Sequence, residues 1–221
     1  MLAQYKTVKG PGIDEMVIKK SRFIGHARPV ATEDEAVRFI ESIKQQHKLA
    51  NHNCSAYMIG QRDEIQKQSD DGEPSGTGGR PILEVIKNQG LKNVAVVVTR
   101  YFGGIMLGAG GLIRAYTDGA VIGIAAAVPV YQVLHKEIHV EIDYTWHGKM
   151  ENELRGRKVL VEDTHFTDKV TLICLPTAGE ADAFTGWVQD VTQGQGVIIQ
   201  GDERYIEHAV GNQDGAGTTG I

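Results

Sequence analysis

From Ser69 to Tyr116 the chain reads SDDGEPSGTGGRPILEVIKNQGLKNVAVVVTRYFGGIMLGAGGLIRAY. Two glycine-rich segments, the first loop (69–80) and the second loop (100–111), enclose a short helical pattern and a strongly apolar run. That run, Val94 to Thr99, is rich in β-branched residues and is typical of a strand buried on both faces of a sheet. We therefore expect a central strand with a glycine loop and a helix before it and after it.

Each glycine loop leads into a predicted helix, the first near Pro81 and the second near Gly110. Proline is tolerated in the first turn of a helix because its missing N–H would be unpaired there. A helix N-terminus offers bare backbone N–H groups and a partial positive charge, which suit anions. Arg80, Arg100 and Arg114 add guanidinium groups whose geometry matches phosphate. The pattern predicts a site for a phosphate or another anion.

The periodicity of the remaining sequence predicts an α+β protein with two domains. Up to the glycine- and alanine-rich helix at 110–127, which we expect to pack closely on the sheet, the order is β-β-β-α-β-β-α-β-α. From residue 133 the order is β-α-β-β-α-β, which is typical of a ferredoxin-like domain. We expect domains at 1–132 and 133–208. A disordered tail rich in glycine, threonine and asparagine is expected at 209–221.

Charge is distributed unevenly along the 221 residues, whose net charge is −5. Residues 1–134 carry 16 Lys and Arg against 13 Asp and Glu, whereas residues 135–221 carry 7 against 15. This difference favours an anionic partner for the first half, although a balance so close to neutral is equally compatible with an ordinary surface.

Cysteine content and hydropathy point to a cytoplasmic protein without a membrane partner. The two cysteines, Cys54 and Cys174, lie in different predicted domains, which fits a reducing compartment. No apolar run approaches the roughly 18 residues that span a bilayer. The N-terminal sequence MLAQYKTVKG lacks the apolar core of a signal peptide.

Standard nucleotide motifs are absent from the glycine loops. The second loop has Gly108 and Gly110, but Ile113 breaks the dinucleotide fingerprint, and no P-loop string occurs. A looser phosphate cradle would be formed by glycines that let a ligand approach the backbone closely. Alternatively, these glycines serve tight turns and helix packing. They are Gly103, Gly104, Gly108, Gly110 and Gly111.

An acidic cluster at Asp70, Asp71 and Glu73 opens the first loop. It would suit a Mg²⁺ ion that assists phosphate chemistry. We favour the alternative that these side chains accept loop N–H groups or pair with Arg80 or Arg100.

Several further side chains near the loops have a chemical and a structural interpretation. His52 and Cys54 face the same side of a strand and could bind a soft metal or form a thiolate–imidazole pair, but a hydrogen-bonded His52 lining the loops is favoured. Ser75 and Thr77 are candidate nucleophiles without an assignable histidine partner. Tyr101 and Phe102 could stack nucleobases or pack in the core, and core packing is the weaker alternative for Tyr101.

The segments SDDGEPSGTGGRP and VVVTRYFGGIMLGAGGLIRAY, with HNCSAY from His52 to Tyr57, resemble the signature of the YigZ/IMPACT family. The resemblance implies a two-layer N-terminal domain of the type found in ribosomal proteins and GHMP-type kinases. It also implies a second domain similar to the C-terminal domain of elongation factor G. Gly78 stands where relatives often have alanine, which leaves the conformation of the first loop open.

This resemblance implies a non-enzymatic, cytoplasmic, translation-associated regulator that binds RNA or ribosomal components and needs no metal or cofactor. A protein partner could bind the acidic second domain. The alternative is a Mg²⁺-dependent enzyme that acts on a phosphorylated small molecule or nucleotide. The expected binding residues are Arg80, Arg100, Tyr101, Gly103, Gly104, Gly108, Gly110, Gly111 and Arg114, supported by His52, Asp70, Asp71, Glu73, Ser75 and Thr77.

Overall fold

The computed structural model describes residues 1–211, which form two compact units. The N-terminal unit comprises Tyr5–Tyr131 together with Glu207 and the described residues after it. The C-terminal unit comprises Met1–Gln4 and Gln132–Ile206. The chain passes between the units three times, after Gln4, Tyr131 and Ile206, and each time the division falls inside a strand rather than in a loop. Most of the predicted tail at 209–221 lies outside the described residues.

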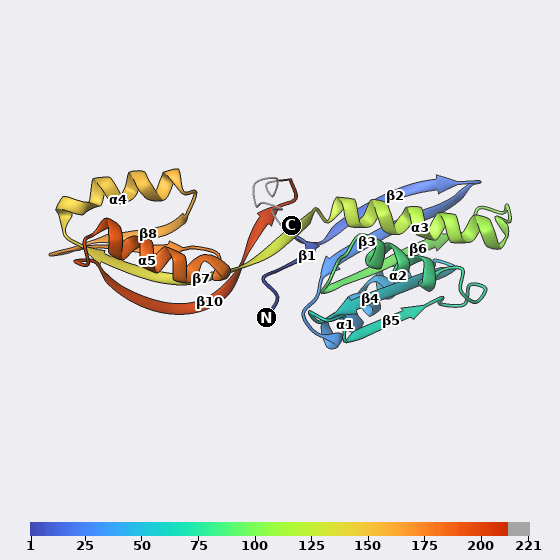
Figure 1. Ribbon diagram of the computed structural model, residues 1–221. Coiled ribbons are helices and arrows are strands. Elements are labelled where there is room, and N and C mark those ends of the chain that lie inside the picture. Colours follow the sequence, from blue (N-terminus) through green and yellow to red (C-terminus); the bar gives the residue numbers. More distant parts are fainter. Residues whose placement is uncertain (212–221) are drawn as a thin grey trace, which may run out of the picture. The chain divides into compact units, whose positions relative to one another are not determined.

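The element order in the first part of the chain is the predicted one (Figure 1). Thr32 accepts a hydrogen bond from the Glu35 N–H and caps the first helix, and Gly90, at φ +65°, follows the end of the second. The elements are β1 (Gln4–Val8), β2 (Gly12–Ile18), β3 (Ser21–Pro29), α1 (Glu33–Gln46), β4 (His52–Ile59), β5 (Ile65–Ser69), α2 (Gly79–Asn88), β6 (Val94–Tyr101) and α3 (Gly108–Ala126).

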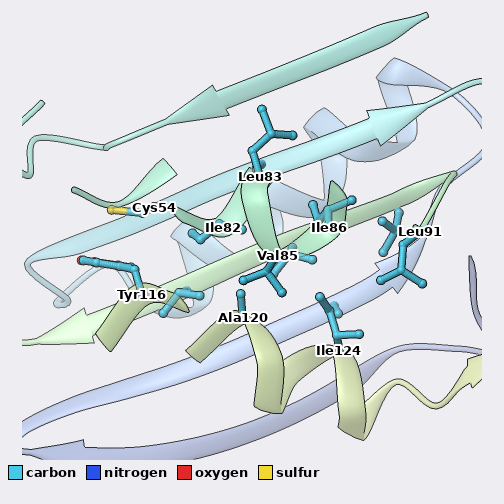
Figure 2. Close-up of a cluster of buried hydrophobic side chains, with 14 of the residues drawn as sticks. Cys54, Ile82, Leu83, Val85, Ile86, Leu91, Tyr116, Ala120 and Ile124 are labelled. Atoms are coloured by element: carbon cyan, nitrogen blue, oxygen red, sulfur yellow. The ribbon is translucent and has the colours of Figure 1, made fainter. Parts of the chain in front are cut away.

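The sheet of the N-terminal unit has the strand order β2-β3-β6-β4-β5, and its ladders are antiparallel. β6 lies at the centre, as its apolar sequence predicts, and residues 94–100 are all buried. α2 and α3 pack over one face of the sheet (Figure 1). The side chains between them and the sheet form the largest apolar cluster, which includes Cys54, Ile82, Tyr116 and Ala120 (Figure 2).

α1 covers the opposite face of the sheet, so the N-terminal unit has a third layer beyond the two that we expected. Val96 and Val98 of β6 pack toward α2 and α3, whereas Ala95 and Val97 pack with Ile40 of α1. Successive side chains of a strand point to opposite faces, and an apolar strand such as β6 needs a cover on both. The N-terminal unit therefore has helices on both sides of its sheet.

α3 approaches the sheet as closely as its small residues predicted. A Cβ atom on Gly25 of β3 would lie 2.0 Å from the carbonyl oxygen of Gly119, and a Cβ on Gly123 would lie 2.7 Å from the backbone of Gly25. Only glycine permits this contact, because the neighbouring atoms belong to the backbone and cannot rotate away.

The C-terminal unit has the predicted order of elements and a second sheet. Its strands are arranged β10-β7-β9-β8, and β1 also pairs with β7. Ile138, Met150 and Leu172 lie at the centre of its core. No helix among residues 1–211 is long and apolar enough to span a membrane. The elements are β7 (Pro129–Ile142), α4 (Tyr144–Gly156), β8 (Leu160–Phe166), β9 (Val170–Leu175), the 3-10 helix η1 (Ala178–Glu180), α5 (Ala181–Val191) and β10 (Val197–Ala209).

Candidate functional site

Asp70 holds the first loop in place. Its Oδ1 accepts hydrogen bonds from the N–H groups of Gly78 and Gly79, at 3.0 and 2.8 Å, and its Oδ2 accepts one from Gly76 at 2.9 Å. Gly78 is the N-cap residue of α2 and Gly79 its first residue, so Asp70 occupies the amides that we expected to be open to an anion. The prediction of bare N–H groups at this helix is wrong because the loop supplies its own carboxylate.

The protonation of Asp70 is coupled to this loop. Partial burial by itself raises its pKa, but the N–H donors of Gly76, Gly79 and Gly78 outweigh burial and hold the pKa below its usual value. A carboxylate with a lowered folded-state pKa stabilises the fold above its unfolded pKa of about 3.9, and the contribution is lost as the pH falls through the folded value.

We expect Asp70→Asn to lower the free energy of unfolding at pH 7 by about 1–3 kcal/mol, because an amide has one acceptor oxygen instead of two. The difference from the wild type should be constant above about pH 5 and shrink below about pH 4. Urea unfolding at a series of pH values measures both effects. Asp118→Asn, at an exposed position of α3, is the control and should leave stability unchanged. Equal stability of both variants at pH 7 would contradict the role of Asp70.

Beneath the loops, Glu73 and Arg100 form a buried ion pair. They are 8% and 6% exposed, and Arg100 Nη1 donates to Glu73 Oε1 at 2.6 Å. The hydroxyl of Tyr116 donates to the same oxygen at 2.8 Å. The Arg100 guanidinium also lies over two aromatic rings, 5.6 Å from the centre of Phe23 and 5.4 Å from that of Phe102. Arg100 is thus enclosed by protein groups and supports the loops from below.

Asp71 joins the first loop to α1 and β4. One of its carboxylate oxygens lies 2.9 Å from Lys44 Nζ and the other accepts the Asn53 N–H at 2.7 Å. The carbonyl oxygen of Asp71 lies 2.9 Å from His52 Nδ1. Since a carbonyl only accepts, Nδ1 carries a proton, and Nε2 faces Glu73 Oε1 at 3.9 Å. His52 is therefore a hydrogen-bonded residue beside the loops, in line with the favoured interpretation.

Cys54 and His52 do not form a thiolate–imidazole pair. The Cys54 Sγ donates to the carbonyl oxygen of Asp70 at 2.9 Å. Burial raises the pKa of the Cys54 thiol to about 12, and the carboxylates of Glu73, Asp70 and Asp71 act in the same direction. A neutral thiol is neither a strong nucleophile nor a good metal ligand. Cys54 belongs to the apolar cluster, and Figure 2 shows it on the same side of that cluster as Tyr116.

Of the two candidate nucleophiles in the first loop, Thr77 is buried and Ser75 is exposed. The Thr77 hydroxyl donates to the carbonyl oxygen of Pro74 at 2.6 Å, so Thr77 serves the loop. Within residues 1–211, no three His, Cys, Asp or Glu side chains are grouped as metal ligands would be.

The backbone of the second loop is open in its middle and close-packed at its start. Gly103 donates to Ser21 Oγ at 3.1 Å, and a Cβ at Gly103 would meet the backbone of Lys20 at 2.0 Å. A Cβ on Gly104, Gly108 or Gly110 would meet no atom within 4 Å. Gly103 therefore allows close packing, whereas Gly104 and the first-turn helix residues Gly108 and Gly110 have open space beside them.

Antiparallel pairing of β3 with β6 places the basic turn between β2 and β3 beside the second loop. Arg22 is opposite Tyr101 in this ladder, and Lys19 and Lys20, which precede it, are exposed. Their proximity to the loop depends on the strand register, which no local pattern contains.

Arg80 and Arg114 are the expected binding residues whose side chains face solvent. Arg80 lies in the first turn of α2 and Arg114 in the second turn of α3. A groove of about 280 Å³ runs between these helices. It is lined by Gly76, Arg80, Pro81, Glu84, Val85, Asn88, Ile113 and Thr117.

The two aromatic residues of the second loop have different environments. Tyr101 is half-buried, and its hydroxyl lies 3.0 Å from His47 Nδ1. Phe102 is 47% exposed, although its backbone N–H donates to Asn51 Oδ1 at 2.8 Å. Core packing was the weaker alternative for Tyr101, yet Phe102 is the residue that is open to solvent. It was not among the expected binding residues.

Comparison with known proteins identifies both parts of the chain. Residues 19–124 match the Impact N-terminal domain, and residues 140–195 match a domain of unknown function, DUF1949. IMPACT family member YvyE of Bacillus subtilis is 50% identical over 210 residues, which cover 95% of this chain and 97% of YvyE. The chain belongs to the IMPACT family. The first loop, the second loop and the Glu73–Arg100 pair all lie within its Impact N-terminal domain.

Other relatives share different portions of this IMPACT family protein. IMPACT family member YigZ of Escherichia coli is 44% identical over 104 residues, 46% of this chain and 51% of YigZ. Protein IMPACT of Homo sapiens is 36% identical over 95 residues, 41% of this chain and 29% of the human protein. A crystal structure of a hypothetical protein superposes with a TM-score of 0.59 at 27% identity, covering 91% of this chain and 99% of that one.

Proposed function

We propose that this IMPACT family protein is a non-enzymatic, translation-associated regulator that binds RNA, free or in ribosomal components, through its two glycine loops. The observation that carries the proposal is the grouping of solvent-facing cations at one end of the N-terminal sheet. Arg80 and Arg114 lie on the helices that follow the loops, and Lys19 and Lys20 lie beside the second loop. Phosphate contacts of this kind supply most of the sequence-independent affinity for nucleic acids.

The open backbone of the second loop supports the same function. Gly104, Gly108 and Gly110 are exposed, and a Cβ on any of them would meet no atom within 4 Å, so a phosphate can approach this backbone closely. Arg100 and Glu73 act as support rather than as ligands, because each is buried against the other.

The geometry favours a binding protein over a Mg²⁺-dependent enzyme. The carboxylates that would hold the metal already have partners in the protein: Asp70 accepts hydrogen bonds, and Asp71 and Glu73 form ion pairs. Releasing them would unfasten the first loop from α2, α1 and β6. An enzyme of this class would show metal-dependent turnover that Asp71→Asn abolishes.

The C-terminal unit is suited to a different partner. Its main segment, residues 132–206, carries 13 acidic against 7 basic residues, so it repels a polyanion. We propose that it contacts a protein while the N-terminal unit contacts RNA.

The double variant Arg80→Ala/Arg114→Ala should weaken binding to bulk cellular RNA and to ribosomal subunits, because two phosphate contacts are lost. In filter-binding titrations from low to moderate salt, the slope of log K against log salt should become shallower by about 1.4, or about 0.7 for each lost contact to a single strand. The wild-type protein should bind most tightly at the lowest salt.

Arg62→Ala/Lys87→Ala is a matched control for this experiment. It removes the same charge from exposed residues near the opposite end of the sheet, before β5 and in the last turn of α2. The control should bind RNA like the wild type, apart from a small effect of net charge. Equal weakening by both double variants would show that the loops are not the site. No RNA binding by the wild type at low salt would overturn the proposed function.

A further inference from the structure

We propose that the ligand of the second loop is an unpaired nucleobase of single-stranded RNA, which stacks on the ring of Phe102. The inference rests on the proposed RNA-binding function and goes further by naming the strand state and the residue that reads it. Phe102 is 47% exposed, so a large part of its ring surface is available to a ligand.

The ring is presented on a rigid base. The guanidinium carbon of Arg100 lies over it, 5.4 Å from the ring centre, and the same carbon lies 5.6 Å from the ring centre of Phe23. Glu73 fixes the guanidinium at 2.6 Å, and all of Phe23 and nearly all of Arg100 are buried. An aromatic group held in this way loses little conformational entropy when a base stacks on it.

The backbone at Phe102 is fixed as well. Its N–H donates to Asn51 Oδ1 at 2.8 Å, and the Asn51 N–H donates to the Arg100 carbonyl oxygen at 2.9 Å. Asn51 thereby joins the start of β4 to the end of β6 and holds the backbone from which the Phe102 ring projects. Met106, in the same loop, is 83% exposed.

Single-stranded RNA fits this arrangement better than a duplex. A base can reach an exposed ring only when it is unpaired and turned out of its stack, whereas the bases of an A-form helix are stacked on one another. The cations around the loop, Lys19, Lys20 and Arg114, would contact the phosphates on either side of that nucleotide. One aromatic ring among several cations is the combination that binds single strands with little sequence preference.

Fluorescence anisotropy with a labelled uridine oligomer, an abasic oligomer of equal length and an RNA duplex of equal length tests the inference. The wild type should bind the uridine oligomer most tightly. Phe102→Ala should weaken that binding about tenfold or more and leave the abasic oligomer unaffected, because only the stacked base is lost. Met106→Ala, at a still more exposed apolar residue of the loop, should bind all three probes like the wild type.

Phe102→Trp gives a second, direct measurement. The new indole should keep the affinity for the uridine oligomer, and its fluorescence should be quenched on binding, after subtraction of the signal from the native Trp146 and Trp187 measured in the wild type. Melting followed by circular dichroism confirms that each variant is folded. RNA binding that Phe102→Ala leaves unchanged, or an unquenched Phe102→Trp, would overturn the stacking inference while the proposed function stands. Absence of binding to every RNA by the wild type would overturn both.

Discussion

Glu73→Ala is expected to lower the free energy of unfolding of the N-terminal unit by about 3–5 kcal/mol, because it leaves the guanidinium of Arg100 buried without its counter-charge. Arg100 is 6% exposed, and Glu73 Oε1 is the acceptor of its one short hydrogen bond to a side chain among the described residues. The substitution also removes the acceptor of the fully buried Tyr116 hydroxyl. Urea unfolding followed by circular dichroism measures the change.

Removing both charges should be less harmful than removing one. In Glu73→Met/Arg100→Met the uncompensated charge is gone, and apolar side chains of similar length fill the space between Phe23 and Tyr116. Buried ion pairs are often replaced in this way with little loss of stability. The double variant should therefore unfold at a higher urea concentration than either single variant, which gives a coupling energy of the kind that a double-mutant cycle isolates.

Glu84→Ala is the matched control for the buried pair, because Glu84 is exposed on α2. Its effect on stability should stay within about 0.5 kcal/mol. A Glu73→Ala variant as stable as Glu84→Ala would mean that Arg100 is solvated and that the pair does not support the loops. In that case Arg100 would return to the set of residues available to RNA.

The order of the elements could be predicted from the sequence because it depends on local periodicity. The alternation in β4 and the apolar run of β6 mark strands, and the spacing of Ala36, Ile40 and Ile43 marks α1. The position of α1 on the far face of the sheet was missed. The face of the sheet on which a helix packs depends on the chain connections and on packing. The hydrophobic periodicity of the helix does not determine it.

The candidate site was predicted in composition but not in the assignment of roles. The loops, their arginines and Asp70 were recognised, yet Arg100 could not be identified as buried. Its direction follows from β6 continuing to Tyr101, which places Arg100 on the same face as Val98 and Tyr101 on the other. Partners 27 to 54 residues away, Glu73 for Arg100 and His47 for Tyr101, then fix both side chains.

The exposure of Phe102 could not be predicted from the sequence either. Nothing in RYFGG distinguishes the aromatic residue that ends a strand from the one that follows it. Only the extent of the ladder, in which Tyr101 is the last paired residue of β6, leaves Phe102 beyond the sheet and open to solvent. Likewise, the ladder brings Lys19 and Lys20 to the second loop from about 80 residues away, a pairing that register rather than propensity determines.

Gly25→Ala is expected to destabilise the N-terminal unit by roughly 3 kcal/mol or more, at the upper end of overpacking effects. Its Cβ would lie 2.0 Å from the carbonyl oxygen of Gly119 and 3.0 Å from the Gly123 nitrogen. These are backbone atoms of α3, so no side-chain rotation relieves the clash. α3 would have to move away from β3, and such a shift would open the apolar cluster formed with Phe23, Tyr116 and Ile124.

Gly110→Ala in the same helix separates this steric effect from the general properties of glycine. A Cβ at Gly110 meets no atom within 4 Å, and alanine favours helix, so the variant should be as stable as the wild type or slightly more stable. The urea concentrations at the midpoints of unfolding compare the two. If Gly25→Ala unfolds at the same urea concentration as Gly110→Ala, α3 can move away from β3 without loss of stability. The close packing of helix on strand then does not hold the loops in place. If Gly25→Ala alone is destabilised, the helix that carries Arg114 and follows the second loop is held in position by direct backbone contact with the sheet.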